Sequence, residues 1–133
     1  MSRILFAVAL LAAFAGTRAL AHHAFAAEYD ESKLVTVEGV VAKFEWTNPH
    51  AWLYVDAKDE QGSAARWSFE MGSPNGLRRR GWRKEALKAG DRITIDGYRA
   101  KDGRSVANAR IVTFSDGHTL FGGFQSTPRA PGK

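Results

Sequence analysis

The side chains best suited to chemistry in this chain are its four histidines, His22, His23, His50 and His118. A histidine at a free N-terminus can bind a metal ion through its α-amino nitrogen and its imidazole together. The amine has an ordinary pKa of about 8, so a metal displaces its proton readily near neutral pH. A further imidazole completes a T-shaped set of three nitrogens, and tetragonal nitrogen sites favour Cu(II).

These features predict a metal site, with copper as its ion, formed by His22 together with His23 and His50. His50 is the best further donor because it follows a predicted turn and opens a predicted strand. The alternative interpretation is that His22 and His23 are an irregular polar leader and that His50 is an ordinary residue at a strand edge. His118 lies in a glycine-rich hairpin, where we expect it to be merely exposed.

A free amine at His22 requires removal of a leader. Arg3 precedes an apolar run at 4–15, and Ala19-Leu20-Ala21 fits the small-residue rule for signal cleavage, so residues 1–21 are predicted to be a cleaved export signal. The run is shorter than the roughly 20 helical residues that span a bilayer, and we expect no transmembrane segment after processing. A second small-residue motif at 24–26 lies farther away, and cleavage there would remove both histidines. The expected location is periplasmic or secreted.

Composition excludes several classes of chemistry. The chain has no cysteine, which removes disulfides, thiol catalysis and zinc–thiolate sites. The chain has 19 basic and 14 acidic residues. Removal of the predicted leader takes away Arg3 and Arg18 and leaves 17 basic residues, so the net charge of the mature chain is +3. Such a mild excess does not indicate a nucleic-acid binder. No nucleophile elbow, phosphate loop, dinucleotide fingerprint or zinc-protease motif occurs. We therefore predict a binding protein; copper redox catalysis on the same nitrogens is an alternative.

Two further surfaces are candidates for binding. If Leu53 and Val55 face the core, then Trp52 and Tyr54 face outward beside His50, where aromatic rings could stack on a small ligand such as a sugar or a base. The alternative is that the arm or the tail covers them. The run Arg78-Arg79-Arg80-Gly81-Trp82-Arg83-Lys84 has five positive charges in seven residues. It could bind an anionic polymer or a partner protein, or it could be the solvated side of a helix.

The expected elements are strands at 34–46, 50–57 and 66–71, a helix capped by Ser73 and begun by Pro74, and strands at 92–98 and 107–114. The first strand changes phase, which predicts a bulge at Gly39. Three strands, a helix and two strands is the order of an OB-fold-like, partly open five-stranded barrel, all-β apart from its one helix. An immunoglobulin-like sandwich, the alternative, would need about seven strands. The predicted division is an irregular N-terminal arm at 22–33, a barrel domain at 34–124 and a tail at 125–133.

Five stretches together resemble one known family. They are His22-His23-Ala24-Phe25, Glu45-Trp46-Thr47-Asn48-Pro49-His50, Gly72-Ser73-Pro74-Asn75, Arg80-Gly81-Trp82 and Gly97-Tyr98-Arg99-Ala100-Lys101-Asp102-Gly103. The chain is similar in these positions to the domain-of-unknown-function 6152 family of small exported bacterial proteins. The resemblance implies an exported location and a shared fold. It implies no catalytic residues, because the family has no assigned activity.

Overall fold

The computed structural model describes residues 24–59 and 61–123. Most of the described chain is β-structure, with short helices at two places. The elements are β1 (Tyr29–Glu45), β2 (Trp52–Lys58), β3 (Ala64–Glu70), α2 (Pro74–Arg78), β4 (Arg92–Ala100), β5 (Val106–Phe114) and β6 (Thr119–Phe121), and a helical turn at 24–28 precedes β1. No helix of the described ranges is long and apolar enough to cross a membrane.

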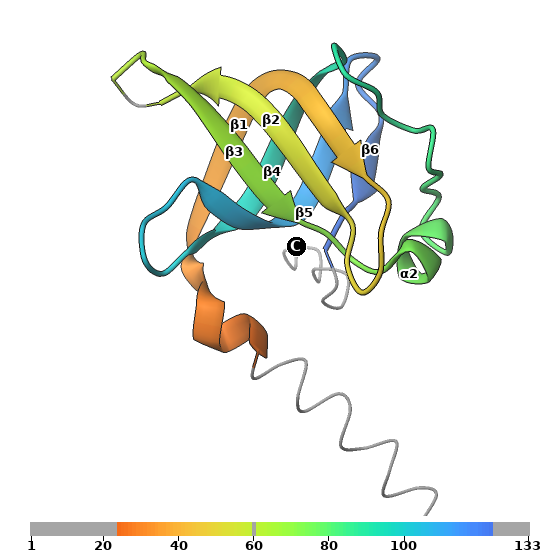
Figure 1. The fold of residues 1–133 in the computed structure, drawn as a ribbon, viewed down its shortest axis with the longest axis horizontal. Helices are drawn as coiled ribbons and strands as arrows, with labels where there is room; N and C mark the ends of the chain where they lie inside the picture. Colours follow the sequence, from red (N-terminus) through yellow and green to blue (C-terminus); the bar gives the residue numbers. More distant parts are fainter. Residues whose placement is uncertain (1–23, 60, 124–133) are drawn as a thin grey trace, which may run out of the picture.

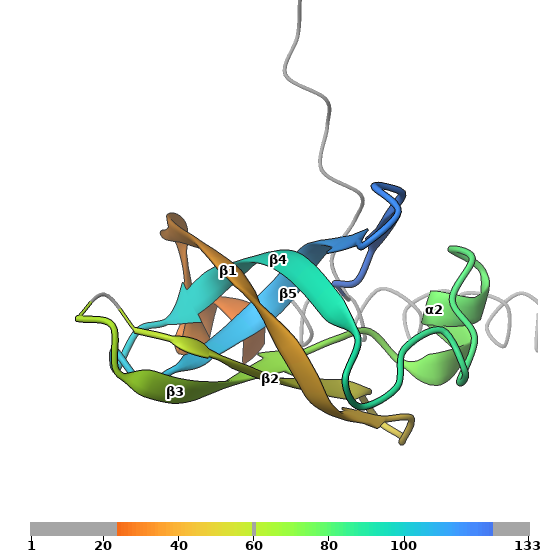
Figure 2. The same ribbon diagram turned by 90° about the horizontal axis from the view of Figure 1, so that it is seen from above.

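Five strands form a ring. The sheet order is β3-β2-β1-β4-β5-β6 with antiparallel neighbours, and a parallel pairing of β3 with β5 closes the ring. Seen from above, β4 and β5 lie on one side and β2 and β3 on the other, with β1 crossing between them (Figure 2). The expected five-strand order, with a helix between the third and fourth strands, is confirmed (Figure 1). The short β6 is an addition that follows a turn at Gly117, where φ is +90°.

The first strand pairs with strands on both sides of the ring, but its bulge is not at the predicted position. β1 pairs with β4 up to Val40 and with β2 from Val40 onward. The register with β2 shifts between Val41 and Lys43, so the predicted bulge at Gly39 is wrong. The physical reason is that Val40 and Val41 are equally apolar, and their alternation alone cannot tell which one faces inward. The structure buries Val41.

Gly39 instead permits a close approach between β1 and β2. A Cβ atom at this position would lie 2.4 Å from the backbone oxygen of Asp56 and 2.8 Å from Cγ1 of Val55. Both distances are shorter than real contacts allow, and one partner is backbone that cannot move aside cheaply. Glycine is therefore required here by space.

Replacing Gly39 with alanine is expected to lower the free energy of unfolding by about 1–3 kcal/mol, the usual cost of overpacking a tight site. Urea unfolding followed by tryptophan fluorescence measures it. Glu38→Ala, at the adjacent exposed position, is the control and should change stability by less than about 0.5 kcal/mol. Equal stability of the two variants would show that β1 and β2 are not in close contact at Gly39.

The interior of the ring comes from one face of each strand. Leu53 and Val55 from β2 and Phe69 from β3 are fully buried, as the alternation of these strands predicted. Leu77 of α2 and Trp82 extend the same core beyond the ring. α2 begins as expected: the Ser73 hydroxyl accepts a hydrogen bond from the Gly76 amide at 3.2 Å, and Pro74 is the first helical residue.

Candidate functional site

Three side chains from three strand ends meet at one carboxylate. His50 lies just before β2, Glu70 is the last residue of β3, and Tyr29 is the first residue of β1. His50 Nδ1 lies 2.6 Å from Glu70 Oε1, and the Tyr29 hydroxyl donates a hydrogen bond to Glu70 Oε2. Each carboxylate oxygen therefore receives a donor from a different part of the chain.

The charge state of this cluster follows from its surroundings. The Glu70 side chain is only 13% exposed. Burial by itself would raise its pKa, but the hydrogen bonds from His50 and Tyr29 outweigh burial, and the pKa of Glu70 is lowered. Burial first, and then the hydrogen bond to Glu70, raise the pKa of Tyr29 far above its ordinary value. At neutral pH Glu70 is therefore a carboxylate and Tyr29 a neutral hydroxyl donor.

The contact with Glu70 also sets the tautomer of His50. An ionised carboxylate can only accept hydrogen bonds, so Nδ1 of His50 carries a proton. In the neutral ring the lone pair is then on Nε2, which is the arrangement seen in histidines that ligate metals through Nε2 while a carboxylate holds Nδ1–H. The His50 side chain is 32% exposed, so its ring is within reach of solvent.

The closure of the ring fixes the backbone of Glu70. Glu70 pairs with Asn108 in the parallel contact between β3 and β5. Asn108 is buried, and its side-chain amide donates to the Glu70 backbone oxygen at 3.4 Å. Across the other neighbour, Glu70 pairs with Trp52 of β2. The carboxylate thus projects from a backbone held on both sides.

Residues 24–29, here called the docked segment, pack against the end of the ring. Phe25 is 1% exposed and Tyr29 is 2% exposed, and together with Ala100 they form a second small apolar cluster. The ring centroids of Phe25 and Tyr29 are 5.5 Å apart, and Tyr98 meets Phe25 edge-on at 5.8 Å. The expectation of an irregular arm before Leu34 is therefore wrong for residues 24–33: two buried aromatic rings give the docked segment an apolar side, and β1 starts at Tyr29.

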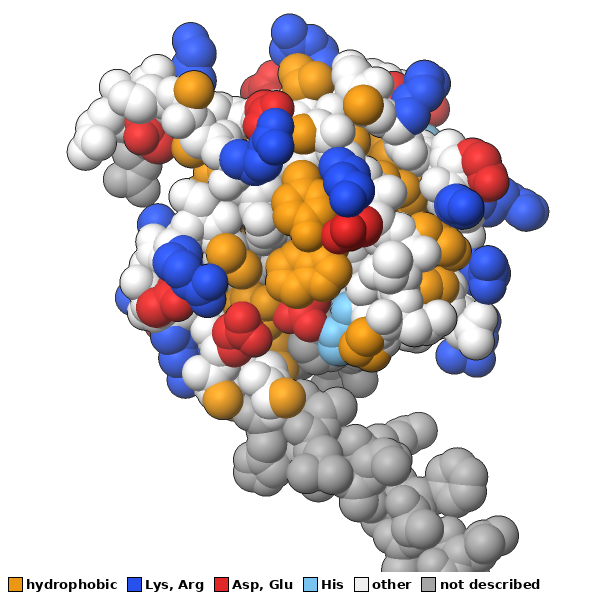
Figure 3. Space-filling view, viewed as in Figure 1, with side chains coloured by type: hydrophobic (Ala, Val, Ile, Leu, Met, Phe, Trp, Pro, Cys, Tyr) orange, Lys and Arg blue, Asp and Glu red, His pale blue; other side chains and the backbone are white. Residues whose placement is uncertain are grey.

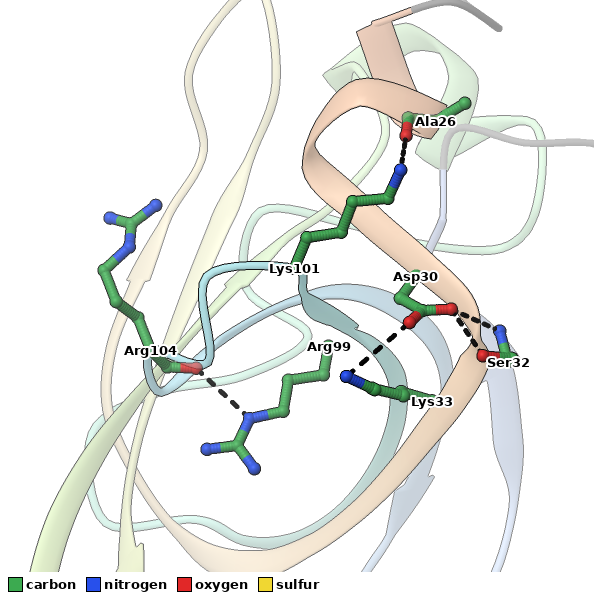
Figure 4. Close-up of polar contacts among 7 residues, drawn as sticks. All are labelled: Ala26, Asp30, Ser32, Lys33, Arg99, Lys101 and Arg104. Atoms are coloured by element: carbon green, nitrogen blue, oxygen red, sulfur yellow. Dashed lines mark hydrogen bonds and ion pairs between the residues drawn. The ribbon is translucent and has the colours of Figure 1, made fainter.

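Polar contacts fix the docked segment to the hairpin between β4 and β5. The Lys101 amide donates to the Glu28 backbone oxygen at 2.9 Å, and the Lys101 ammonium donates to the Ala26 backbone oxygen (Figure 4). Near the start of β1, Asp30 accepts a hydrogen bond from the Ser32 hydroxyl at 2.6 Å. The start of the described chain is thus held beside the cluster of Tyr29, Glu70 and His50.

Of the predicted metal ligands, the structure places only one. His50 lies in the cluster, whereas His22 and His23 lie outside the described residues. His118 belongs to a separate turn, where its Nδ1 lies 2.5 Å from Asp116 and its ring stacks on Phe114. Within 24–59 and 61–123, no three histidine or acidic side chains gather in a way that could hold a metal ion.

Trp52 and Tyr54 face outward on β2, as predicted from the inward positions of Leu53 and Val55. Both are half-buried, and their rings lie 6.5 Å apart at an angle of 20°. Hydrophobic side chains gather at the centre of this face, with acidic side chains and a histidine beside them (Figure 3). Tyr54 donates to Glu45 Oε2 at 2.9 Å. Binding of a ligand by this pair stays a prediction.

The basic run is divided between internal contacts and solvent. The Arg78 guanidinium lies 5.5 Å from the centroid of Trp46, and Arg80 donates to the Gly123 backbone oxygen at 2.6 Å. Arg83 and Lys84 line, with Arg78, a hollow of about 530 Å³. α2 lies to one side of the ring, away from the helical turn at 24–28, in both ribbon views.

Sequence reasoning missed Glu70 and Tyr29 as site residues. In the sequence, Glu70 is a lone acid that belongs to no motif. The signal that could have found it is the hairpin turn near Gly62, which sets the register of β2 against β3 and puts Trp52 opposite Glu70. His50, two residues before Trp52, then lies diagonally across from Glu70 on the same face.

These observations define a small β-ring protein with a histidine–carboxylate–tyrosine cluster at one end. Comparison with known families then gives its membership. The chain belongs to DUF6152, a family of unknown function whose model matches residues 9–109. No curated protein and no solved structure matched the chain. Three stretches that carry the resemblance meet at this end of the ring, through Phe25, His50 and the Ala100–Lys101 corner.

Proposed function

We propose that this protein is exported and binds copper between its mature N-terminus and His50. The observation that carries the proposal is the 2.6 Å contact of His50 Nδ1 with Glu70. A carboxylate behind a histidine fixes the orientation of the ring and raises the basicity of the other nitrogen, which improves it as a metal ligand. The role that fits such a site is metal handling or sensing.

The docked segment supports the participation of the N-terminal histidines. Tyr29 contacts the same carboxylate as His50, and Phe25 packs on Tyr29. His23 is bonded to Ala24, and each residue adds at most about 3.6 Å of chain. A chain that begins at His22 therefore begins only three residues before the buried Phe25.

The donor set favours copper over other ions. His22 supplies an amine and an imidazole, His50 supplies the imidazole held by Glu70, and His23 is a further donor. Nitrogen ligands in a tetragonal arrangement favour Cu(II), whereas structural zinc sites use four ligands that usually include thiolates. The chain has no cysteine to supply thiolates.

Export follows from the leader and supplies the free amine. The leader directs the chain to a compartment outside the cytoplasm, and its removal after Ala21 frees the amine of His22.

The terminal amine is tested by acetylating the α-amino nitrogen of the chain that begins at His22. The free chain should bind Cu(II) about 10- to 100-fold more tightly than the acetylated chain, because acetylation removes the amine from the chelate it forms with its own imidazole; this scale is that of a disturbed metal site. Competition titration with a copper chelator of known affinity measures both. Equal affinities would contradict a role for the amine, and mass spectrometry showing that the exported chain starts at Ala27 would remove His22 and His23 altogether.

A further inference from the structure

We infer that Glu70 is a positioning residue that couples the docking of residues 24–29 to the orientation of His50. As a statement about metal binding this rests on the proposed function, but the coupling itself belongs to the metal-free protein. Its basis is the shared carboxylate, which accepts from Tyr29 on Oε2 and from His50 on Oε1.

The carboxylate satisfies both donors at once, each on its own oxygen. The Tyr29 hydroxyl and His50 Nδ1–H both need an acceptor, and Glu70 offers one oxygen to each. An amide in its place would offer a single acceptor oxygen and a donor nitrogen. Because the two donors meet different oxygens of Glu70, one of them would then face the amide nitrogen, and that contact would be lost or both donors would have to move to one oxygen.

The burial of Glu70 makes both hydrogen bonds important. With 13% of the Glu70 side chain exposed, water is a poor substitute for either donor. The backbone of Glu70 is fixed between Trp52 and Asn108, so the carboxylate can respond to its partners only by turning about its side-chain bonds. A change at Tyr29 therefore turns the carboxylate, and the carboxylate turns the imidazole.

Coupling of this kind acts in both directions. A docked Tyr29 holds the His50 ring in one orientation, with its Nδ1–H on Glu70. A ligand on Nε2 holds His50, and through Glu70 it holds Tyr29 and the chain that precedes it. The N-terminal residues and His50 would thus be brought together before the ion arrives.

The test uses the metal-free chain beginning at His22 and the variant Tyr29→Phe, which keeps the ring that packs on Phe25 but removes the hydroxyl. Two NMR signals report the outcome. The His50 ring nitrogens report its tautomer and hydrogen bonding. The Lys101 amide, which donates to Glu28, reports docking through its hydrogen-exchange rate.

In Tyr29→Phe, the His50 ring nitrogens should shift and the Lys101 amide should exchange about tenfold faster, the size expected for one hydrogen bond. The Gly103 amide, which bonds to Ala100 within the hairpin, should not change. Tyr54→Phe is the matched control, because it removes another tyrosine–glutamate hydrogen bond on β2, and it should leave both signals unchanged.

Glu70→Gln is the second variant, and it should move the His50 signals further, because the amide is uncharged and has one acceptor oxygen where Glu70 has two. Unchanged His50 nitrogens in Tyr29→Phe, with Lys101 exchanging faster, would overturn the coupling. A failure of the coupling can be told apart from a failure of the proposed function. Copper titration of the unmodified chain tests the metal site, whereas the NMR signals are measured without metal.

Discussion

Replacing His50 with alanine in the chain that begins at His22 is expected to weaken Cu(II) binding by about 100-fold or more, since even a residue behind a metal ligand is worth about 10- to 100-fold. The substitution removes the imidazole whose Nδ1 is held by Glu70. The ring of five strands should still form in this variant, because His50 is half-buried and precedes the first residue of β2. Competition titration measures the affinity, and circular dichroism confirms the fold.

His118→Ala is the matched control for this substitution. His118 is likewise paired with a carboxylate, Asp116, but it lies in the turn before β6 and takes no part in the cluster. Its loss should leave copper affinity unchanged. If His50→Ala and His118→Ala behaved alike, copper would be bound without His50, and only the N-terminal histidines would remain as ligands.

Replacing Phe25 with alanine is expected to release the docked segment while leaving the ring folded. A fully buried phenylalanine is worth about 3–5 kcal/mol relative to alanine. Phe25 belongs to the small cluster with Tyr29 and Ala100 and not to the main core, so we expect the loss to appear as local undocking. The exchange rate of the Lys101 amide should rise about 100-fold, which corresponds to about 2.7 kcal/mol.

Copper affinity should fall when the docked segment is released in Phe25→Ala, because the N-terminal donors are then no longer held beside His50. The control is Glu38→Ala, which removes an exposed side chain from β1 outside this cluster and should change neither quantity. An unchanged Lys101 exchange rate in Phe25→Ala would mean that the backbone contacts of Lys101 hold the segment without the aromatic ring.

The parts of the fold that could be predicted are those with a local signal. Alternation in β2 and β3 placed Leu53, Val55 and Phe69 inside, and Trp52 and Tyr54 outside. The serine–proline pair at 73–74 gave the start of α2. Strong alternation and capping residues act within a few positions, so a single sequence is enough to read them.

The parts that could not be predicted depend on contacts between distant segments. The bulge was misplaced because Val40 and Val41 offer the same apolar surface, and only the pairing of β1 with both β4 and β2 decides between them. The docked segment was missed because Phe25 and Tyr29 find their partners near Ala100, some 70 residues along the chain. Glu70 was missed because a lone acid becomes a site residue only through its register with β2.

The central claim is that one copper ion is bound by the mature N-terminus and His50 together. Pulsed EPR of the Cu(II)-loaded chain beginning at His22, compared with its His50→Ala variant, counts the imidazoles bound to the ion. One imidazole fewer in the variant is the result that this structure predicts. The same imidazole count in both would contradict it, because His50 would then not be a ligand and the cluster with Glu70 would serve another purpose.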